Sequence, residues 1–142
     1  MQRVAIILVV WCVGFISAEK PAVRLDKQKT LDIMQSLIQC VAETNVNPEV
    51  LIKMRNGDTF PDKVDSNVHK FVNCAFVKTG YGKKNGHVKA AKMVDLFPDN
   101  VKEQMKAVVE KCDSKDGKDP NETTYLFFKC FTEESPVHVV LE

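Results

Sequence analysis

The sequence has little of what catalysis or metal binding usually requires. It contains only three histidines, and His69, His87 and His138 are scattered outside any metal-ligand or nucleophile–base motif. No G-x-S-x-G motif occurs, and the glycines of GYGKKNG follow no predicted strand and do not match the spacing of a phosphate-binding loop. These absences predict that the protein is not an enzyme and carries no metal and no cofactor.

The chain also lacks an excess of charge of either sign. Its 142 residues include 20 Lys and Arg and 19 Asp and Glu. One of the basic residues, Arg3, lies in the apolar N-terminal segment that is described below as a predicted signal peptide. Without it, basic and acidic residues are equal in number. A neutral surface disfavours nucleic acid and anionic lipid as main partners, because both are held chiefly by clustered positive charge. We therefore expect no nucleic-acid partner.

Long apolar runs are missing except for one at the start. Residues 4–16 contain no charged side chain, follow Arg3 and precede Ala18. The run is short for a membrane span, and this order of features is typical of a secretory signal peptide, with a membrane anchor as the alternative. We predict a signal peptide at residues 1–18 and a single secreted, extracellular domain at 19–142 that does not insert into a membrane.

Loss of this leader removes Cys12 and also Trp11, the only tryptophan. Four cysteines then remain, at Cys40, Cys74, Cys112 and Cys130. An even number of cysteines in a small secreted chain indicates two disulfides. Each cysteine lies on or beside an apolar helical face, so we expect the bridges to join helices. Four cysteines allow three pairings, and their spacing alone does not choose among them.

The predicted domain consists of helical segments separated by short polar breaks. Apolar residues recur with helical spacing in segments at 25–43, 48–54, 64–76, 87–97, 101–112 and 120–131. Asn47 and Asp119 are predicted N-caps because Pro48 and Pro120 follow them in the first turn. Asn100 and Glu103 have the spacing of a capping box. The fold class is therefore all-α, with about six helices and an extended C-terminal tail at 132–142.

This pattern resembles the insect odorant-binding proteins of the PBP/GOBP family. Most members have six cysteines, paired first to third, second to fifth and fourth to sixth. With Cys74 as the third and Cys130 as the sixth, the second and fifth positions hold Lys70 and Asn121. Both members of one bridge are thus absent together, which resembles the four-cysteine, Minus-C type. The resemblance covers nearly the whole of the predicted domain.

The resemblance implies the pairing Cys40–Cys74 and Cys112–Cys130, and six helices that enclose an apolar cavity. The side chains expected to line this cavity are Met34, Leu37, Ile38, Val41, Leu51, Met54, Phe76, Met93, Leu96, Val108, Val109, Tyr125, Phe128, Phe131 and Val139. Methionine and aromatic side chains suit ligands of varied shape, and Tyr125 also offers a hydroxyl. The same residues equally suit a filled hydrophobic core.

The function that the resemblance implies is reversible transport of small hydrophobic molecules, such as odorants, pheromones or other semiochemicals. A membrane odorant receptor is then a candidate partner, sensillar lymph a candidate location, and a monomer or weak homodimer the expected state. The alternatives are a general lipid carrier of the same fold, or a secreted interaction or signalling protein with a filled core. The sequence leaves open whether His138 makes the tail pH-sensitive and whether the sequon at Asn121 is glycosylated.

Overall fold

The computed structural model describes residues 20–55 and 64–140, so the predicted signal peptide lies outside the described residues. The described helices are α2 (Lys27–Thr44), α3 (Pro48–Arg55), α4 (Ser66–Lys78), α5 (Ala90–Val94), α6 (Asp99–Asp113) and α7 (Pro120–Glu134), and the strands are β1 (Ala22–Arg24) and β2 (His138–Val140). The prediction of an all-α fold with about six helices is confirmed. Within the described ranges, no helix is long and apolar enough to cross a bilayer.

Local sequence signals explain where several helices begin. The Asp119 carboxylate accepts a hydrogen bond of 2.8 Å from the Glu122 N–H, with Pro120 in the first turn of α7. The Asn47 side chain likewise accepts a 3.0 Å bond from the Glu49 N–H ahead of α3. Both predicted caps are confirmed, because a short polar side chain satisfies an N–H that the first turn leaves unpaired.

Two predicted helix boundaries are wrong. The start of α6 does not use Asn100 and Glu103 as a capping box: the helix begins at Asp99, and Pro98 precedes it with φ −65° and ψ 155° and no side-chain cap. The segment predicted as a helix at 87–97 is helical only in α5, since Val88 forms an antiparallel bridge with Gly82. At α6 the backbone of Pro98 sets the start of the helix, and at α5 the bridge of Val88 to Gly82 does so, against what the local sequence pattern predicts.

The C-terminal segment after α7 is extended, as predicted, although α7 itself continues to Glu134. Strand β2 pairs in parallel with β1, with Val139 opposite Val23, and the His138 N–H donates to the Pro21 carbonyl at 2.9 Å. Val137 is buried beside Phe97. The tail is therefore fixed to the start of the domain by backbone hydrogen bonds and by one buried side chain.

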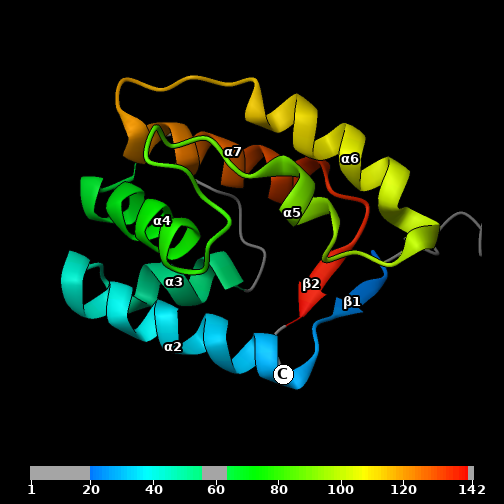
Figure 1. Ribbon diagram of the computed structural model, residues 1–142. Helices are drawn as coiled ribbons and strands as arrows, with labels where there is room; N and C mark the ends of the chain where they lie inside the picture. The colour runs from blue at the N-terminus through cyan, green and yellow to red at the C-terminus, as the bar shows by residue number, and fades with distance from the viewer. Residues whose placement is uncertain (1–19, 56–63, 141–142) are drawn as a thin grey trace, which may run out of the picture.

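Helix α7 lies in the middle of the molecule, between α6 and α4, with α2 and α3 on the far side of α4 (Figure 1). Its Phe127 is 1% exposed, and its ring packs against Phe76 at 5.8 Å and against Phe131 at 5.7 Å between ring centres. These rings connect the core shared by α2, α3 and α4 with the core shared by α5 and α6.

Two disulfides join helices in pairs. Cys40–Cys74 links α2 to α4, and Cys112–Cys130 links α6 to α7. This confirms the pairing that the family resemblance implied. Cross-links over loops of 34 and 18 residues each contribute roughly 3 to 4 kcal/mol on a chain-entropy estimate.

Candidate functional site

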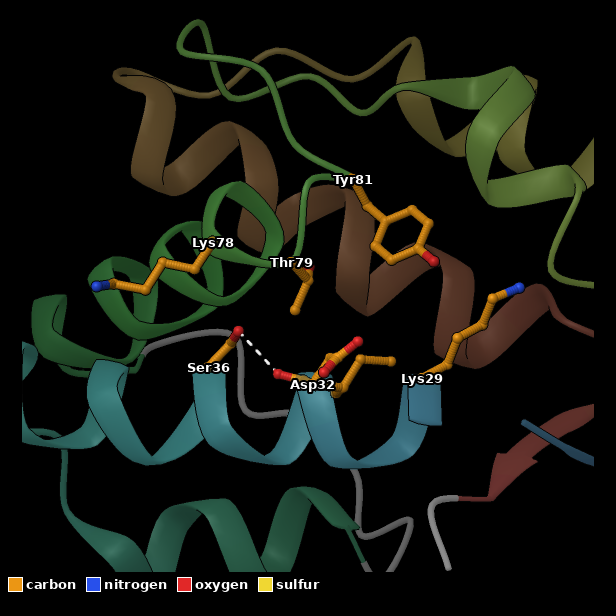
Figure 2. A pocket seen from close by; sticks show the side chains of 7 residues that line it. Lys29, Asp32, Ser36, Lys78, Thr79 and Tyr81 are labelled. Carbon is orange, nitrogen blue, oxygen red and sulfur yellow. Dashed lines mark hydrogen bonds between the residues drawn. The ribbon is translucent and has the colours of Figure 1, made fainter. Parts of the chain in front are cut away.

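A half-open cavity of about 140 Å³ lies between α2 and the C-terminal end of α4. It is lined by Lys29, Asp32, Ile33, Ser36, Lys78, Thr79 and Tyr81. Figure 2 shows the α2 side chains Lys29, Asp32 and Ser36 on one side, facing Thr79 and Tyr81 on the other. The volume is below the 300–1,000 Å³ typical of small-molecule sites, so the cavity as it stands is too small to enclose a typical ligand.

One wall of the cavity is a single face of α2. Lys29, Asp32 and Ser36 share this face because residues three and four apart are neighbours on a helix. The Ser36 hydroxyl donates to the Asp32 carbonyl at 2.9 Å, and the Asp32 carboxylate accepts from Gln28 at 3.0 Å. Ile33 adds an apolar side chain to the lining, so this wall is mixed in polarity.

The opposite wall is the turn that ends α4. The Thr79 hydroxyl donates to the Ala75 carbonyl at 2.7 Å, and Gly80 reverses the chain with φ +84°, a conformation that favours glycine. The Tyr81 ring then lies beneath Lys92, whose Nζ is 5.1 Å from the ring centre. This cation–π contact and a 3.1 Å bond from Lys92 to the Gly80 carbonyl hold the tyrosine in place.

Two ionisable side chains of this site, Tyr81 and Lys78, interact with neighbouring charged groups. Burial raises the pKa of Tyr81, and the nearby Asp26 carboxylate raises it further, so the phenol stays neutral and can donate a hydrogen bond. Lys78 is paired with Glu43 at 2.6 Å. Among the described residues, no group of three or more His, Cys, Asp and Glu side chains could hold a metal ion.

The fifteen side chains predicted to line a ligand cavity lie in several places. Those packed in or against the α2–α3–α4–α7 core are Leu37, Val41, Leu51, Met54, Phe76, Tyr125 and Phe128. Those packed in or against the cores formed with α5 and α6 are Met93, Leu96, Val108, Val109 and Phe131. Met34, Ile38 and Val139 are 43%, 68% and 40% exposed.

None of these side chains is among those that line the cavity of Figure 2, so their role as a ligand-binding surface stays a prediction. Sequence reasoning searched for apolar residues and therefore missed the polar wall of α2 and the turn at Tyr81.

Tyr125 is only 3% exposed, and its ring lies 4.6 Å from that of His69. The tail histidine, His138, is exposed on β2.

Sequence reasoning also missed a polar cluster around His87. Its Nδ1 lies 2.9 Å from the Asp113 carbonyl and 3.1 Å from the Asp113 carboxylate. Its Nε2 lies 2.8 Å from the Asp116 carboxylate. Only the folded chain brings these groups together, because more than twenty residues separate the histidine from either aspartate. The cluster joins the loop before α5 to the end of α6.

Several solved structures share this fold. The fatty acid binding protein OBP56a from the oral disk of the blowfly Phormia regina is 27% identical, with a TM-score of 0.64 and coverage of 79% of this chain and 96% of that chain. Odorant Binding Protein 4 of Chrysopa pallens is 25% identical, with a TM-score of 0.62 and coverage of 77% and 91%. Odorant Binding Protein 7 of Anopheles gambiae, solved with an azo compound, is 19% identical, with a TM-score of 0.63 and coverage of 76% and 86%.

No curated protein sequence matches the chain, but a family model does. The model of the PBP/GOBP family matches residues 22–134, which is most of the chain. The family and the structural neighbours are odorant-binding carriers rather than enzymes. The positions of the two disulfides agree with the four-cysteine type. This chain therefore belongs to the PBP/GOBP family and is of the Minus-C type.

Proposed function

We propose that this protein is a secreted carrier that binds small hydrophobic molecules reversibly and catalyses no reaction. The observation that carries the proposal is the family match over residues 22–134 on a helical fold. Two neighbours support it by what they bind: the blowfly protein is a fatty acid binding protein, and the mosquito protein was solved with an azo compound.

The proposed route into the protein starts at the cavity between α2 and Tyr81. A ligand would enter past Ile33 toward the core that contains Leu37, Phe76 and Phe128. Because the cavity holds only about 140 Å³, side chains have to move as the ligand enters, and flexible Met54 suits this role. Burial of roughly 330 Å² of apolar ligand surface at about 25 cal/mol per Å² corresponds to micromolar affinity.

The finer role that we propose is chemosensory. The carrier would take odorants, pheromones or other semiochemicals through sensillar lymph to a membrane odorant receptor, as a monomer or weak homodimer. A general carrier of lipids in another secreted fluid would need the same fold and the same cavity. Tissue localisation of the protein separates these two roles, because only the chemosensory role requires expression in sensilla.

Displacement of a fluorescent apolar probe tests the carrier proposal. Residues 19–142 would be refolded with both disulfides, freed of lipid and titrated with N-phenyl-1-naphthylamine, because this part of the chain has no tryptophan for intrinsic quenching. We expect saturable micromolar binding that selected volatiles displace. Ile33→Trp should block the entrance and weaken binding, whereas Leu31→Trp, at a residue 54% exposed on the same helix, should not.

One observation favours the interaction-protein alternative. Leu31, Met34 and Ile38 are all exposed on α2, and their spacing places them on one face. Ile52 on α3 is 58% exposed. Exposed apolar patches often mark contacts with other proteins. A correctly folded chain that does not bind the probe would overturn the carrier proposal and make this face the preferred functional surface.

A further inference from the structure

Thr30 on α2 has a buried hydroxyl that is not hydrogen-bonded to any described part of the chain. The residue is 4% exposed, and its Oγ1 makes no hydrogen bond to any of the described residues. Buried polar atoms in folded proteins are nearly always hydrogen-bonded, because an unpaired hydroxyl in an apolar environment lowers stability. The exception at Thr30 therefore requires a physical explanation.

Most other threonines of the described chain use their hydroxyl in a local hydrogen bond that Thr30 does not make. A hydroxyl donates to the carbonyl four residues back at Thr44 (2.7 Å), Thr79 (2.7 Å), Thr123 (2.9 Å) and Thr132 (2.7 Å), whereas Thr124 donates to the Gly86 carbonyl at 2.7 Å. The matching carbonyl for Thr30 is that of Asp26, which accepts the Thr30 N–H at 3.0 Å. This local bond is common for helical threonine, yet the Thr30 hydroxyl does not use it.

The position of Thr30 connects it to the proposed entrance. Lys29 and Ile33, which line the cavity, stand on either side of it along α2. Thr30 and Ile33 are three residues apart and so are neighbours on the helix surface. Thr30 is more deeply buried than either of them. Thr30 is thus on the buried side of α2, next to residues that line the cavity but not itself part of the lining.

We propose that the Thr30 hydroxyl anchors the oxygen of a neutral ligand, such as a long-chain alcohol, aldehyde, ketone or ester, whose hydrocarbon part lies among the apolar side chains of the interior. This inference rests on the proposed carrier function. A neutral oxygen fits better than a carboxylate, because a buried anion needs a desolvated cation beside it. The adjacent Lys29 is unsuited to that role, since its side chain is 52% exposed and contacts Asp26.

Thr30→Val tests the anchor, because valine keeps the shape of threonine and removes only the hydroxyl. The competitors would be 1-decanol and 1-chlorodecane, which have the same chain length, in displacement of N-phenyl-1-naphthylamine. We expect Thr30→Val to weaken binding of the alcohol roughly three- to tenfold, the effect of one lost hydrogen bond, and to change that of the chloride less than twofold. Thr44→Val is the matched control on the same helix and should leave the preference for alcohol unchanged.

Thermal unfolding without ligand gives a second readout. The unliganded Thr30→Val protein should melt at or above the temperature of the wild type, since valine buries no unpaired polar atom. A clear drop in melting temperature would show that the hydroxyl has a structural partner and would overturn the proposal. Probe binding with an unchanged ratio of alcohol to chloride affinity would overturn the anchor alone. Absence of probe binding by the folded wild type would overturn the anchor and the carrier function together.

Discussion

His87 is expected to make the stability of this protein depend on pH. Its two ring nitrogens face two different carboxylates, with Nδ1 3.1 Å from Asp113 and Nε2 2.8 Å from Asp116. A neutral imidazole carries one N–H and can donate to only one of them, whereas the protonated ring donates to both. The Val88 N–H also donates to the Asp113 carboxylate at 3.0 Å, which fixes that acceptor in place.

The pKa of His87 is raised above 6.5. Partial burial lowers it, but hydrogen bonds from the ring to the Asp113 and Asp116 side chains, the charge of Asp113 and its carbonyl together raise it by more. A raised pKa in the folded state means that the folded chain holds the proton more tightly than the unfolded chain. The stabilisation is therefore complete below about pH 6.5 and is lost as the pH rises through the folded-state pKa.

The size of the effect follows from the exposure of the three side chains. His87 and Asp113 are 24% and 22% exposed, so their charged hydrogen bond contributes about 1.5 kcal/mol. Asp116 is 78% exposed, and its contact contributes about 0.5 kcal/mol. Glutamine keeps one neutral amide nitrogen, which can donate to one of the two carboxylates. His87→Gln should thus lower the free energy of unfolding by about 1 kcal/mol at pH 6 and by close to zero at pH 9, where neutral histidine also donates from a single nitrogen.

Urea unfolding followed by circular dichroism between pH 5.5 and 9 measures this difference. His138→Gln is the control, because His138 is exposed and makes no ion pair within the described part of the chain. The pH dependence that His87 produces should remain in this variant. A His87→Gln difference that is constant over the whole range, or that grows as the pH rises, would show that the doubly hydrogen-bonded, protonated ring does not form.

Four further predictions concern stability. Gly86 has φ +90°, and a Cβ there would lie 2.8 Å from the Cα of Pro120, so Gly86→Ala should reduce the free energy of unfolding by roughly 3 kcal/mol. Gly80→Ala, where φ is +84° but the nearest atom is the end of a flexible lysine, should lose only about 1 kcal/mol in the same urea titration. Phe127→Ala should lose about 3 to 5 kcal/mol by calorimetry, because it empties a fully buried site between two rings. Replacement of Lys70 and Asn121 by cysteine should form a third bridge, detectable as the loss of two free thiols, and raise the melting temperature.

The disulfide pairing and the starts of α3 and α7 were predictable, the pairing from the family resemblance and the two helix starts from local features of the sequence. Cys40 with Cys74 followed from the resemblance once Lys70 had been recognised at an absent cysteine position. The caps at Asn47 and Asp119 follow from hydrogen bonds that span two or three residues. Such signals are complete within a few residues and need no knowledge of the rest of the fold.

The short α5 and the cavity were not predictable for the opposite reason. Val88 pairs with Gly82 and donates a hydrogen bond to Asp113, twenty-five residues away. These contacts with residues outside the segment prevent the longer helix that its apolar pattern predicts. The cavity likewise combines one face of α2 with Tyr81, which follows a turn at a glycine. A search for apolar residues at helical spacing finds helix cores, and the polar entrance lies outside that pattern.

The absence of the middle bridge divides the covalent structure into two pairs of helices. One disulfide joins α2 to α4 and the other joins α6 to α7, so the junction between α4 and α7 is entirely non-covalent. It contains a 2.9 Å bond from the Asn73 amide to the Thr124 hydroxyl and a 3.5 Å bond from the same amide to the Pro120 carbonyl. Two such bonds contribute about 2 kcal/mol, whereas a bridge would contribute about 4 kcal/mol.

These hydrogen bonds and the packing of Phe76 against Phe127 and Phe128 hold the α4–α7 junction without a covalent link. We therefore expect this junction to separate more readily than the two disulfide-linked pairs. Phe76 and Phe128 belong to the two helices of this junction, and both contact the core into which a ligand is proposed to move. Small separations of α4 from α7 would give these rings room to shift. The same loss of a bridge that lowers stability would then speed ligand entry, and a third disulfide at Lys70 and Asn121 should slow probe association while raising the melting temperature.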